Sequence, residues 1–224
     1  MSVYNDEATL ADSVNSILEQ TFRDLVLVVY EDASTDGSRR ILGRYDDPRL
    51  KVRALETNRG LSANLADGVA RAASDYIARM DADDIAMPER LAEQVTRLDA
   101  DPEIDVLGTN VIFFDDAGNQ SLGIQPAEHD EIALALFFGF TMMHPTVMMR
   151  TAALRRGGWN YDLQFTYSQD FDLWSRMLPH HRFANLQRPL LKLREHPRKI
   201  SRAKRPEQQA FTQEIRARQL QRVL

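Results

Sequence analysis

The stretch DLVLVVYEDASTDGS, residues 24–38, changes abruptly from an apolar run to a polar loop. Its first half is compact and rich in β-branched residues, and such a run ended by turn-forming residues is typical of a buried parallel strand. Just upstream, TLADSVNSILEQ (9–20) spaces Leu10, Val14 and Ile17 as one face of a helix. A helix that leads into a buried strand indicates an α/β protein.

The same alternation continues downstream of this strand. The expected elements are helix 38–45, strand 50–55, helix 61–74, strand 75–80, helix 88–100 and strand 104–114. Pro88 suits the first turn of its helix, because no intrahelical donor is needed there. This order predicts a mostly parallel, doubly wound α/β sheet with helices on both faces.

The composition narrows the class of protein. The chain has 224 residues, of which 43% are hydrophobic and 27% charged, as in an ordinary globular protein of one domain or one domain with an appendage. A formal charge of −5 argues against a general nucleic-acid binder, and the lack of cysteine excludes disulfides and thiolate metal sites. No signal peptide is evident. The apolar run 132–143 is too short to cross a bilayer, so we expect a core helix running into a loop.

Three carboxylates crowd together where the expected strand 75–80 ends, at Asp81, Asp83 and Asp84. Ligands of such sheets bind beyond the carboxyl ends of the strands, and clustered carboxylates there are suited to Mg²⁺ or Mn²⁺. The alternative is that Asp83 and Asp84 cap the following helix and complement its dipole. Arg79 could pair with a neighbouring carboxylate, and we assign it no chemistry.

Seven blocks resemble, in order, the motifs of family-2 glycosyltransferases, which are inverting, sugar-nucleotide-dependent enzymes of the GT-A fold. These blocks are MSVYNDE, SILEQTFRDLVLVVYEDASTDGS, NRGLSANLADGVARA, YIARMDADDIAMPERL, HPTVMMR, QDFDLWSRM and LREHPRKIS. The resemblance runs from Met1 to about Ser201. It implies one GT-A domain over 1–201, with a nucleotide-sugar half at about 1–100 and an acceptor half at about 101–201. Residues 202–224 then form a helical tail.

The resemblance implies a nucleotide pocket lined by Ser2, Asp32, Asn58 and Arg59. Asp32 would accept a hydrogen bond from the base, commonly the imide N–H of uracil, so the expected donor is a UDP-sugar. Asp32 could instead form an Asx-turn that organises its loop, and the two roles can coexist.

The resemblance also implies a metal cofactor, Mn²⁺ or Mg²⁺, at Asp83, with Asp81 bordering the ribose and the water shell of the metal. His196 would reach this metal or close over the donor phosphates, with Arg198 and Lys199 facing the diphosphate. A solitary histidine is also often structural, so both readings of His196 stay open.

The block QDFDLW (169–174) resembles a family motif in which the second residue is the general base, here Asp170. An inverting transfer needs such a base, because the acceptor hydroxyl loses its proton as the nucleotide leaves. Gln169 stands where the family usually has glutamate. Asp172 is interpreted as structural, and His144 as mainly structural. Without the resemblance, Asp170 would be interpreted as an acidic residue in the first turn of an ordinary amphipathic helix, where it complements the helix dipole.

The function that the resemblance implies is sugar transfer from a nucleotide-diphosphate donor to a saccharide or lipid-linked saccharide, in polysaccharide, lipopolysaccharide or capsule synthesis. The protein would then act in the cytoplasm, in reach of the inner face of the membrane, and bind no nucleic acid. One alternative is a catalytically silent nucleotide-sugar-binding module. Another is a nucleotidyltransferase, which would be expected to carry a glycine-rich, basic loop near its start, and MSVYNDEATL contains none.

Both ends of the chain add expectations. Relatives would have a longer first strand than Met1-Ser2-Val3 allows, and if that strand were absent the middle of the sheet would have an open edge. The basic tail 205–224 could pack on the domain, form a homodimer or lie on an anionic membrane, and we expect packing on the domain.

Overall fold

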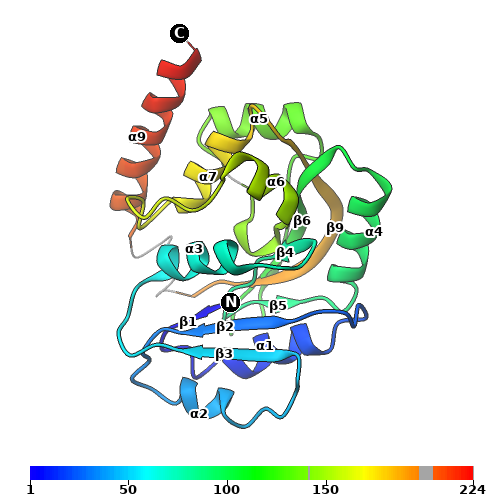
Figure 1. Cartoon of the computed structure of the whole chain (residues 1–224), viewed down its shortest axis with the longest axis vertical. Coiled ribbons are helices and arrows are strands. Elements are labelled where there is room, and N and C mark those ends of the chain that lie inside the picture. Colours follow the sequence, from blue (N-terminus) through cyan, green and yellow to red (C-terminus); the bar gives the residue numbers. More distant parts are fainter. Residues whose placement is uncertain (141, 197–203, 224) are drawn as a thin grey trace.

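The first sheet of the protein is entirely parallel. In the computed structural model, which describes residues 1–140, 142–196 and 204–223, this sheet has the order β1-β2-β3 (Figure 1). Its strands are β1 (Ser2–Val3), β2 (Leu27–Glu31) and β3 (Leu50–Ala54). The expected first strand is therefore present as a two-residue edge strand that pairs with Tyr30 and Glu31.

The second sheet mixes strand directions. It follows the order β4-β8-β6-β9-β5, with β7 added to β6. The strands are β4 (Tyr76–Ala78), β5 (Ile85–Ala86), β6 (Ile104–Phe114), β7 (Gln120–Gly123), β8 (Met148–Arg150) and β9 (Arg182–Arg194). Only β6 and β9 pair in parallel, and the other pairs are antiparallel. The α/β fold is confirmed, and its parallel pairing is concentrated in β1–β3 and in the β6–β9 pair.

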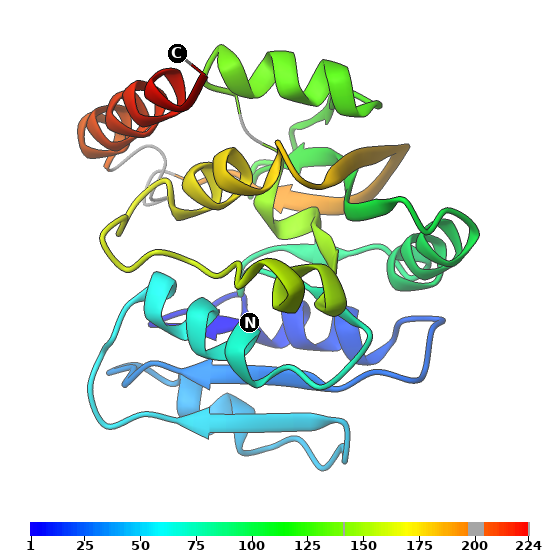
Figure 2. The ribbon, with the colours of Figure 1, turned by 45° about the horizontal axis from the view of Figure 1, so that its top comes forward.

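Helices cover both sheets, as Figure 2 shows from a tilted view. They are α1 (Leu10–Leu18), α2 (Ser38–Leu42), α3 (Leu61–Arg71), α4 (Arg90–Ala100), α5 (His129–Phe137), α6 (Thr151–Gly157), α7 (Gln169–Met177) and α9 (Arg205–Val223), with a 3-10 turn at His144–Thr146. The prediction for Pro88 is wrong: α4 begins two residues later, so Pro88 precedes the helix instead of opening it.

Three buried apolar clusters hold the described part of the molecule together, and two of them are large. The first lies between α1 and the first sheet and includes Val3, Val14 and Val29. The second surrounds Trp174 and Phe183, which are both almost fully buried and in edge-to-face contact. Since each buried aliphatic or aromatic side chain contributes about 1.5–3 kcal/mol, these clusters fix the strand ends that carry the polar loops.

Only part of the apolar run 132–143 is buried in the core. Ile132 and Leu136 on α5 are buried, whereas Leu134, Phe138 and Phe140 are 61%, 60% and 70% exposed. The prediction of a core helix thus holds for one face of α5.

The C-terminal helix α9 packs on the rest of the protein, as we expected of the tail. Its Ile215 is 2% exposed and joins the core around Trp174, and Arg218 lies over the ring of Phe165. The Ser168 hydroxyl donates to the carbonyl oxygen of Gln208 on α9 (3.3 Å). Among the described residues, no helix combines the length and apolarity needed to cross a bilayer.

Candidate functional site

Three carboxylates meet between β4 and β5. Asp81, Asp83 and Asp84 each present an oxygen within 4.8 Å of the other two, and we call this set the acid triad. Asp84 is buried, while Asp81 and Asp83 are half-buried and face outward from the strand ends. None of the three is in the first turn of α4, so the alternative of helix capping is not what the structure has. Hard oxygen donors at this spacing fit a divalent cation such as Mg²⁺ or Mn²⁺.

The end of β9 closes over the acid triad from more than a hundred residues away in sequence. The Nε2 atom of His196 lies 3.1 Å from Oδ2 of Asp83. The backbone N–H of Arg194 donates to Oδ1 of Asp84 (2.9 Å), and its Nε–H donates to the carbonyl oxygen of Asp83 (3.1 Å). His196 therefore lies beside Asp83, the carboxylate for which the resemblance implies a metal. Arg198 and Lys199 lie outside the described residues.

Asp32 organises the neighbouring loop. It is 1% exposed, and its carboxylate accepts the backbone N–H of Arg59 (2.8 Å) and of Gly60 (2.9 Å). Gly60 has a φ of +82°, which a residue with a side chain adopts only with strain. Its N–H is thereby turned toward Asp32. The Asx-turn considered for Asp32 is not what the structure has, because the backbone N–H of Ser34 donates to Oε1 of Glu31 instead (2.7 Å); Asp32 fixes the loop that precedes α3.

The other residues expected to bind nucleotide lie around this carboxylate. The Ser2 hydroxyl accepts a hydrogen bond from Nδ2 of Asn64 (2.9 Å), whose Oδ1 in turn accepts one from the guanidinium of Arg59 (3.2 Å). Asn58 is exposed. A cavity of about 690 Å³ opens at the carboxyl ends of β2 and β3, lined by Ala33, Ser34, Asp36, Arg39, Arg40, Leu55 and Glu56. It begins one residue beyond Asp32 and offers space for a flat base.

The loop after β1 adds a fourth carboxylate, Asp6. The pKa of Asp6 is raised to about 6, mainly by burial and also by the negative charges of Asp83, Asp81 and Asp36, against a backbone N–H from Tyr4 that lowers it. Asp6 thus lies close enough to the acid triad to sense its charge. The position of Asp6 is fixed by its own backbone N–H, which donates to the Ser38 hydroxyl (3.0 Å).

Asp170 lies in the first turn of α7 and is half-buried. Burial raises the pKa of its carboxyl group; the N–H of Phe171 and the charge of Arg79 lower it, and the charge of Asp81 raises it. Asp170 is thus near enough to Arg79 and Asp81 for their charges to affect its pKa. Asp172 is 4% exposed, and its carboxylate accepts two hydrogen bonds from Arg176 (2.7 and 2.9 Å). These contacts agree with a structural role for Asp172.

A group of buried polar residues adjoins the acid triad through Asp81. Arg79 is 6% exposed and forms an ion pair with Asp81. His144, at the start of the 3-10 turn, lies 2.8 Å from the Tyr161 hydroxyl through its Nε2 atom. Burial, together with the charge of Arg79, lowers the pKa of His144 well below its ordinary value, so the imidazole is neutral. His144 is thus a buried structural residue beside the site.

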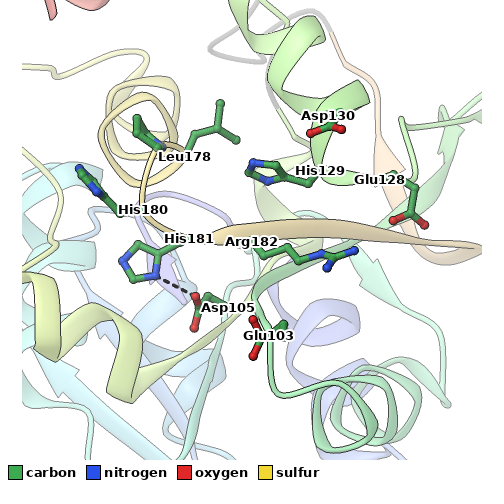
Figure 3. A pocket seen from close by; sticks show the side chains of 10 residues that line it. Glu103, Asp105, Glu128, His129, Asp130, Leu178, His180, His181 and Arg182 are labelled. Atoms are coloured by element: carbon green, nitrogen blue, oxygen red, sulfur yellow. Dashed lines mark hydrogen bonds and ion pairs between the residues drawn. The ribbon is translucent and has the colours of Figure 1, made fainter.

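A second cavity, of about 570 Å³, lies at the opposite end of β9 (Figure 3). His181 there is 2.8 Å from Asp105 through Nδ1 and accepts a hydrogen bond from the Trp159 indole N–H (2.7 Å) through Nε2. The cavity contains none of the residues expected to bind donor or metal. The acid triad contacts the last residues of β9, whereas this cavity begins at its first, Arg182.

Comparisons with known proteins identify the family. The model of the family described as "Glycosyl transferase family 2" matches residues 1–158. The chain belongs to glycosyl transferase family 2. It is 38% identical over 200 residues to EpsE of Bacillus subtilis, which is named as a glycosyltransferase, covering 87% of this chain and 71% of EpsE. It is 30% identical over 200 residues to the amylovoran biosynthesis glycosyltransferase AmsE of Erwinia amylovora, covering 87% of this chain and 74% of AmsE.

Solved structures agree on the fold of this family-2 member. The first 349 residues of TarS from S. aureus, in complex with UDP, superpose with a TM-score of 0.76 at 21% identity, over 97% of this chain and 63% of that one. The mannosyltransferase PcManGT from Pyrobaculum calidifontis, in complex with GDP-Man and Mn²⁺, gives a TM-score of 0.68 at 20% identity, over 99% of this chain and 62% of that one. The present chain thus spans about two thirds of each of these neighbours. The neighbours are GT-A glycosyltransferases, so the GT-A fold is established.

Three residues of this site were not predicted from the sequence. Asp6, Asn64 and Tyr161 are isolated polar residues in the sequence, and each becomes part of the site only through contacts with distant segments. Arg79 was expected to pair with a neighbouring carboxylate, and it does so with Asp81. In the sequence, the importance of Arg79 was indicated only by its position as a charged residue within the pattern of a buried strand.

Proposed function

We propose that the protein is an inverting glycosyltransferase that moves a sugar from a nucleotide-diphosphate donor, UDP-linked, to a hydroxyl group of a saccharide or lipid-linked saccharide. The observation that supports this proposal is the acid triad with the imidazole of His196 beside Asp83, together with Asp170, whose carboxyl group senses the charges of Arg79 and Asp81. A cation-binding group that holds a diphosphate and a carboxylate that can take a proton are the two parts that the reaction needs.

The cellular role that we propose is synthesis of a cell-envelope polysaccharide. AmsE, named for amylovoran biosynthesis, and WbnJ of Escherichia coli, named for O-antigen biosynthesis, support this; WbnJ is 30% identical over 207 residues. We further propose that residues 1–100 hold the donor and 101–201 the acceptor. The protein would act in the cytoplasm, where it could reach lipid-linked acceptors at the inner face of the membrane.

The donor atoms of the acid triad fit a divalent cation, because three carboxylate oxygens converge and the His196 imidazole lies beside Asp83. Asp83 and His196 would hold the cation, and Asp81 would border the ribose and the metal's water shell. When bound, Mn²⁺ or Mg²⁺ would neutralise charge on the leaving diphosphate. TarS in complex with UDP and PcManGT in complex with GDP-Man and Mn²⁺ support a donor of this class.

The chain's own residues would perform the transfer as follows. Asp32, Ser2, Asn58 and Arg59 would hold the nucleotide at the ends of β1 and β2 and the start of α3. The Asp170 carboxylate would accept the proton of the acceptor hydroxyl as that oxygen bonds to the anomeric carbon and the nucleoside diphosphate departs. A single displacement of this kind inverts the anomeric centre.

Asp32 would select the nucleotide. Its two oxygens already accept the N–H groups of Arg59 and Gly60, and carboxylate oxygens retain further lone pairs. Uracil can donate an N3–H to one of these, whereas N3 of cytosine carries no hydrogen. We therefore expect UDP to bind at least about tenfold more tightly than CDP, because an unmatched buried acceptor costs about 1–3 kcal/mol.

The identity of the released product tests this function against its rivals. The protein is incubated with nucleotide sugars, Mn²⁺ and saccharide acceptors, and the products are separated by ion-exchange chromatography. Free nucleoside diphosphate supports sugar transfer, pyrophosphate supports a nucleotidyltransferase, and binding without either product supports a silent module.

A further inference from the structure

Asn64, on helix α3, joins two residues of the proposed nucleotide pocket that come from different segments. Its side chain belongs to a residue that is 1% exposed. Oδ1 of Asn64 accepts a hydrogen bond from Nη2 of Arg59 in the loop before α3 (3.2 Å), and Nδ2 donates to Oγ of Ser2 on β1 (2.9 Å). The direction of these two bonds decides which hydrogen atoms are left for a ligand.

The chemistry of the partners fixes that direction. A guanidinium has N–H donors and no acceptor, so the atom of Asn64 that faces Arg59 must be the amide oxygen. The amide nitrogen, which only donates, must then face Ser2. The Ser2 hydroxyl therefore accepts in this contact, and its own hydrogen is directed away from Asn64.

The hydroxyl hydrogen of Ser2 has no partner within the described part of the protein. Val3 packs in the core beside α1, so the neighbouring Ser2 lies on the other face of β1, toward α3. Ser2 is half-buried, and no described residue accepts a hydrogen bond from its O–H. The same network reaches Asp32, which accepts the backbone N–H of Arg59 (2.8 Å). A free donor is thus held among the residues expected to line the nucleotide pocket.

We propose that Asn64 is a positioning residue that keeps the Ser2 hydroxyl as a donor to an acceptor oxygen of the bound nucleotide. The base carbonyls, the ribose and the diphosphate of a nucleotide all offer such oxygens. This inference rests on the proposed function and adds to it a residue and a direction of hydrogen bonding. It also predicts that a carboxylate at position 64, which accepts from Arg59 and Ser2 alike, would turn the hydroxyl hydrogen away from the ligand.

The test is a double-mutant cycle on nucleotide binding. Isothermal titration calorimetry with Mn²⁺ present finds which of UDP, CDP and GDP the parent binds most tightly, and that nucleotide is titrated into Ser2→Ala, Asn64→Asp and the double variant. Asn64→Asp keeps the size of the side chain and reverses only the bond to Ser2. Its added negative charge weakens binding by the same factor in both Ser2 backgrounds, so the comparison of the two backgrounds removes that effect.

We expect Ser2→Ala to weaken nucleotide binding about fivefold or more, because one hydrogen bond to the ligand is lost. Asn64→Asp should cost about fivefold more affinity when Ser2 is present than in the Ser2→Ala background. Ser62→Ala is the matched control, since it removes a buried hydroxyl of the same helix that donates to the carbonyl oxygen of Phe165 (3.0 Å), and it should bind nucleotide as the parent does.

An equal loss of affinity on Asn64→Asp in the two Ser2 backgrounds would overturn the inference and leave Asn64 as a structural link between α3 and β1. Melting temperatures check that each variant is folded. If Asn64→Asp did not fold, Asn64→Leu would replace it in the same cycle, because it removes the donor that orients Ser2, and an equal loss would again overturn the inference. A parent that bound none of the three nucleotides would instead contradict the proposed function itself.

Discussion

Asp81, Asp83 and Asp84 lie together although their like charges repel one another. Each carboxylate has a positive or hydrogen-donating neighbour: Arg79 for Asp81, His196 for Asp83 and the backbone N–H of Arg194 for Asp84. A divalent cation would add to this compensation and would tie the donor diphosphate to the same carboxylates.

Metal removal should therefore weaken donor binding through Asp83. The melting-temperature increase caused by UDP should be larger with Mn²⁺ than with a chelator, and Asp83→Asn should abolish that difference while leaving the fold intact. Differential scanning fluorimetry measures both. Asp130→Asn, an exposed carboxylate on α5, is the control and should behave as the parent. If UDP stabilised the parent equally with and without metal, the metal role of Asp83 would be wrong.

Asp6 should make the free protein less stable as the pH rises. Its pKa is raised from 3.8 to about 6, first by burial and then by the nearby carboxylates, so ionising it costs more in the folded state than in the unfolded one. Stability is therefore lost as the pH rises from about 4 to about 6. Asp6→Asn should melt like the parent at pH 4 and be more stable above pH 7 by about 1–2 kcal/mol, after a discount for partial exposure.

The exposed Asp24→Asn serves as the control substitution for this pH series. A pH-independent difference for Asp6→Asn would contradict the placement of Asp6 against the acid triad.

The residues of the site could be predicted from sequence better than their partners could. Asp32 and Asp83 stand in motifs that occur at strand ends, and both are found there. Asp32, however, accepts N–H groups 27 and 28 residues away, and Asp83 meets His196 across 113 residues. Such contacts depend on loop conformation, which local sequence patterns do not encode.

Whole helices and strands follow the sequence pattern where that pattern is long. Strand β6 occupies the predicted 104–114, because this eleven-residue segment, whose first eight residues are buried, has no competing periodicity. Strand direction does not follow the pattern in the same way. Strand β4 pairs antiparallel with β8, which comes 70 residues later, and the alternation of helices and strands does not predict that pairing. The mixed second sheet therefore could not be predicted from sequence.

The α9 helix should contribute to stability through one buried side chain. Ile215→Ala removes a 2% exposed residue from the core around Trp174 and should cost about 2–5 kcal/mol of unfolding free energy. Gln213→Ala, exposed on the same helix, should change stability by less than about 0.5 kcal/mol. Urea denaturation followed by circular dichroism measures both. Equal stability of the two variants would contradict the packing of α9 on the domain.

At the scale of the molecule, two sheets bring distant segments to one place. The first sheet supplies the loops with Asp6 and Asp32, and the second supplies the acid triad after β4 and His196 after β9. Helix α7, labelled in Figure 1, carries Asp170 in its first turn. The family match establishes the glycosyl transferase family, and we propose that Asp170 performs the proton transfer.

The most direct test of this central claim is the turnover of Asp170→Asn, measured as nucleoside diphosphate released from the nucleotide sugar that the parent uses, with donor affinity measured in parallel. Asp172→Asn is the neighbouring control, because that carboxylate holds Arg176. We predict that Asp170→Asn loses about 10²–10⁴-fold in turnover while donor affinity stays near the parent value, and that Asp172→Asn loses much less. Near-parent turnover of Asp170→Asn would contradict the account, as would a loss of donor affinity that matched the loss of turnover.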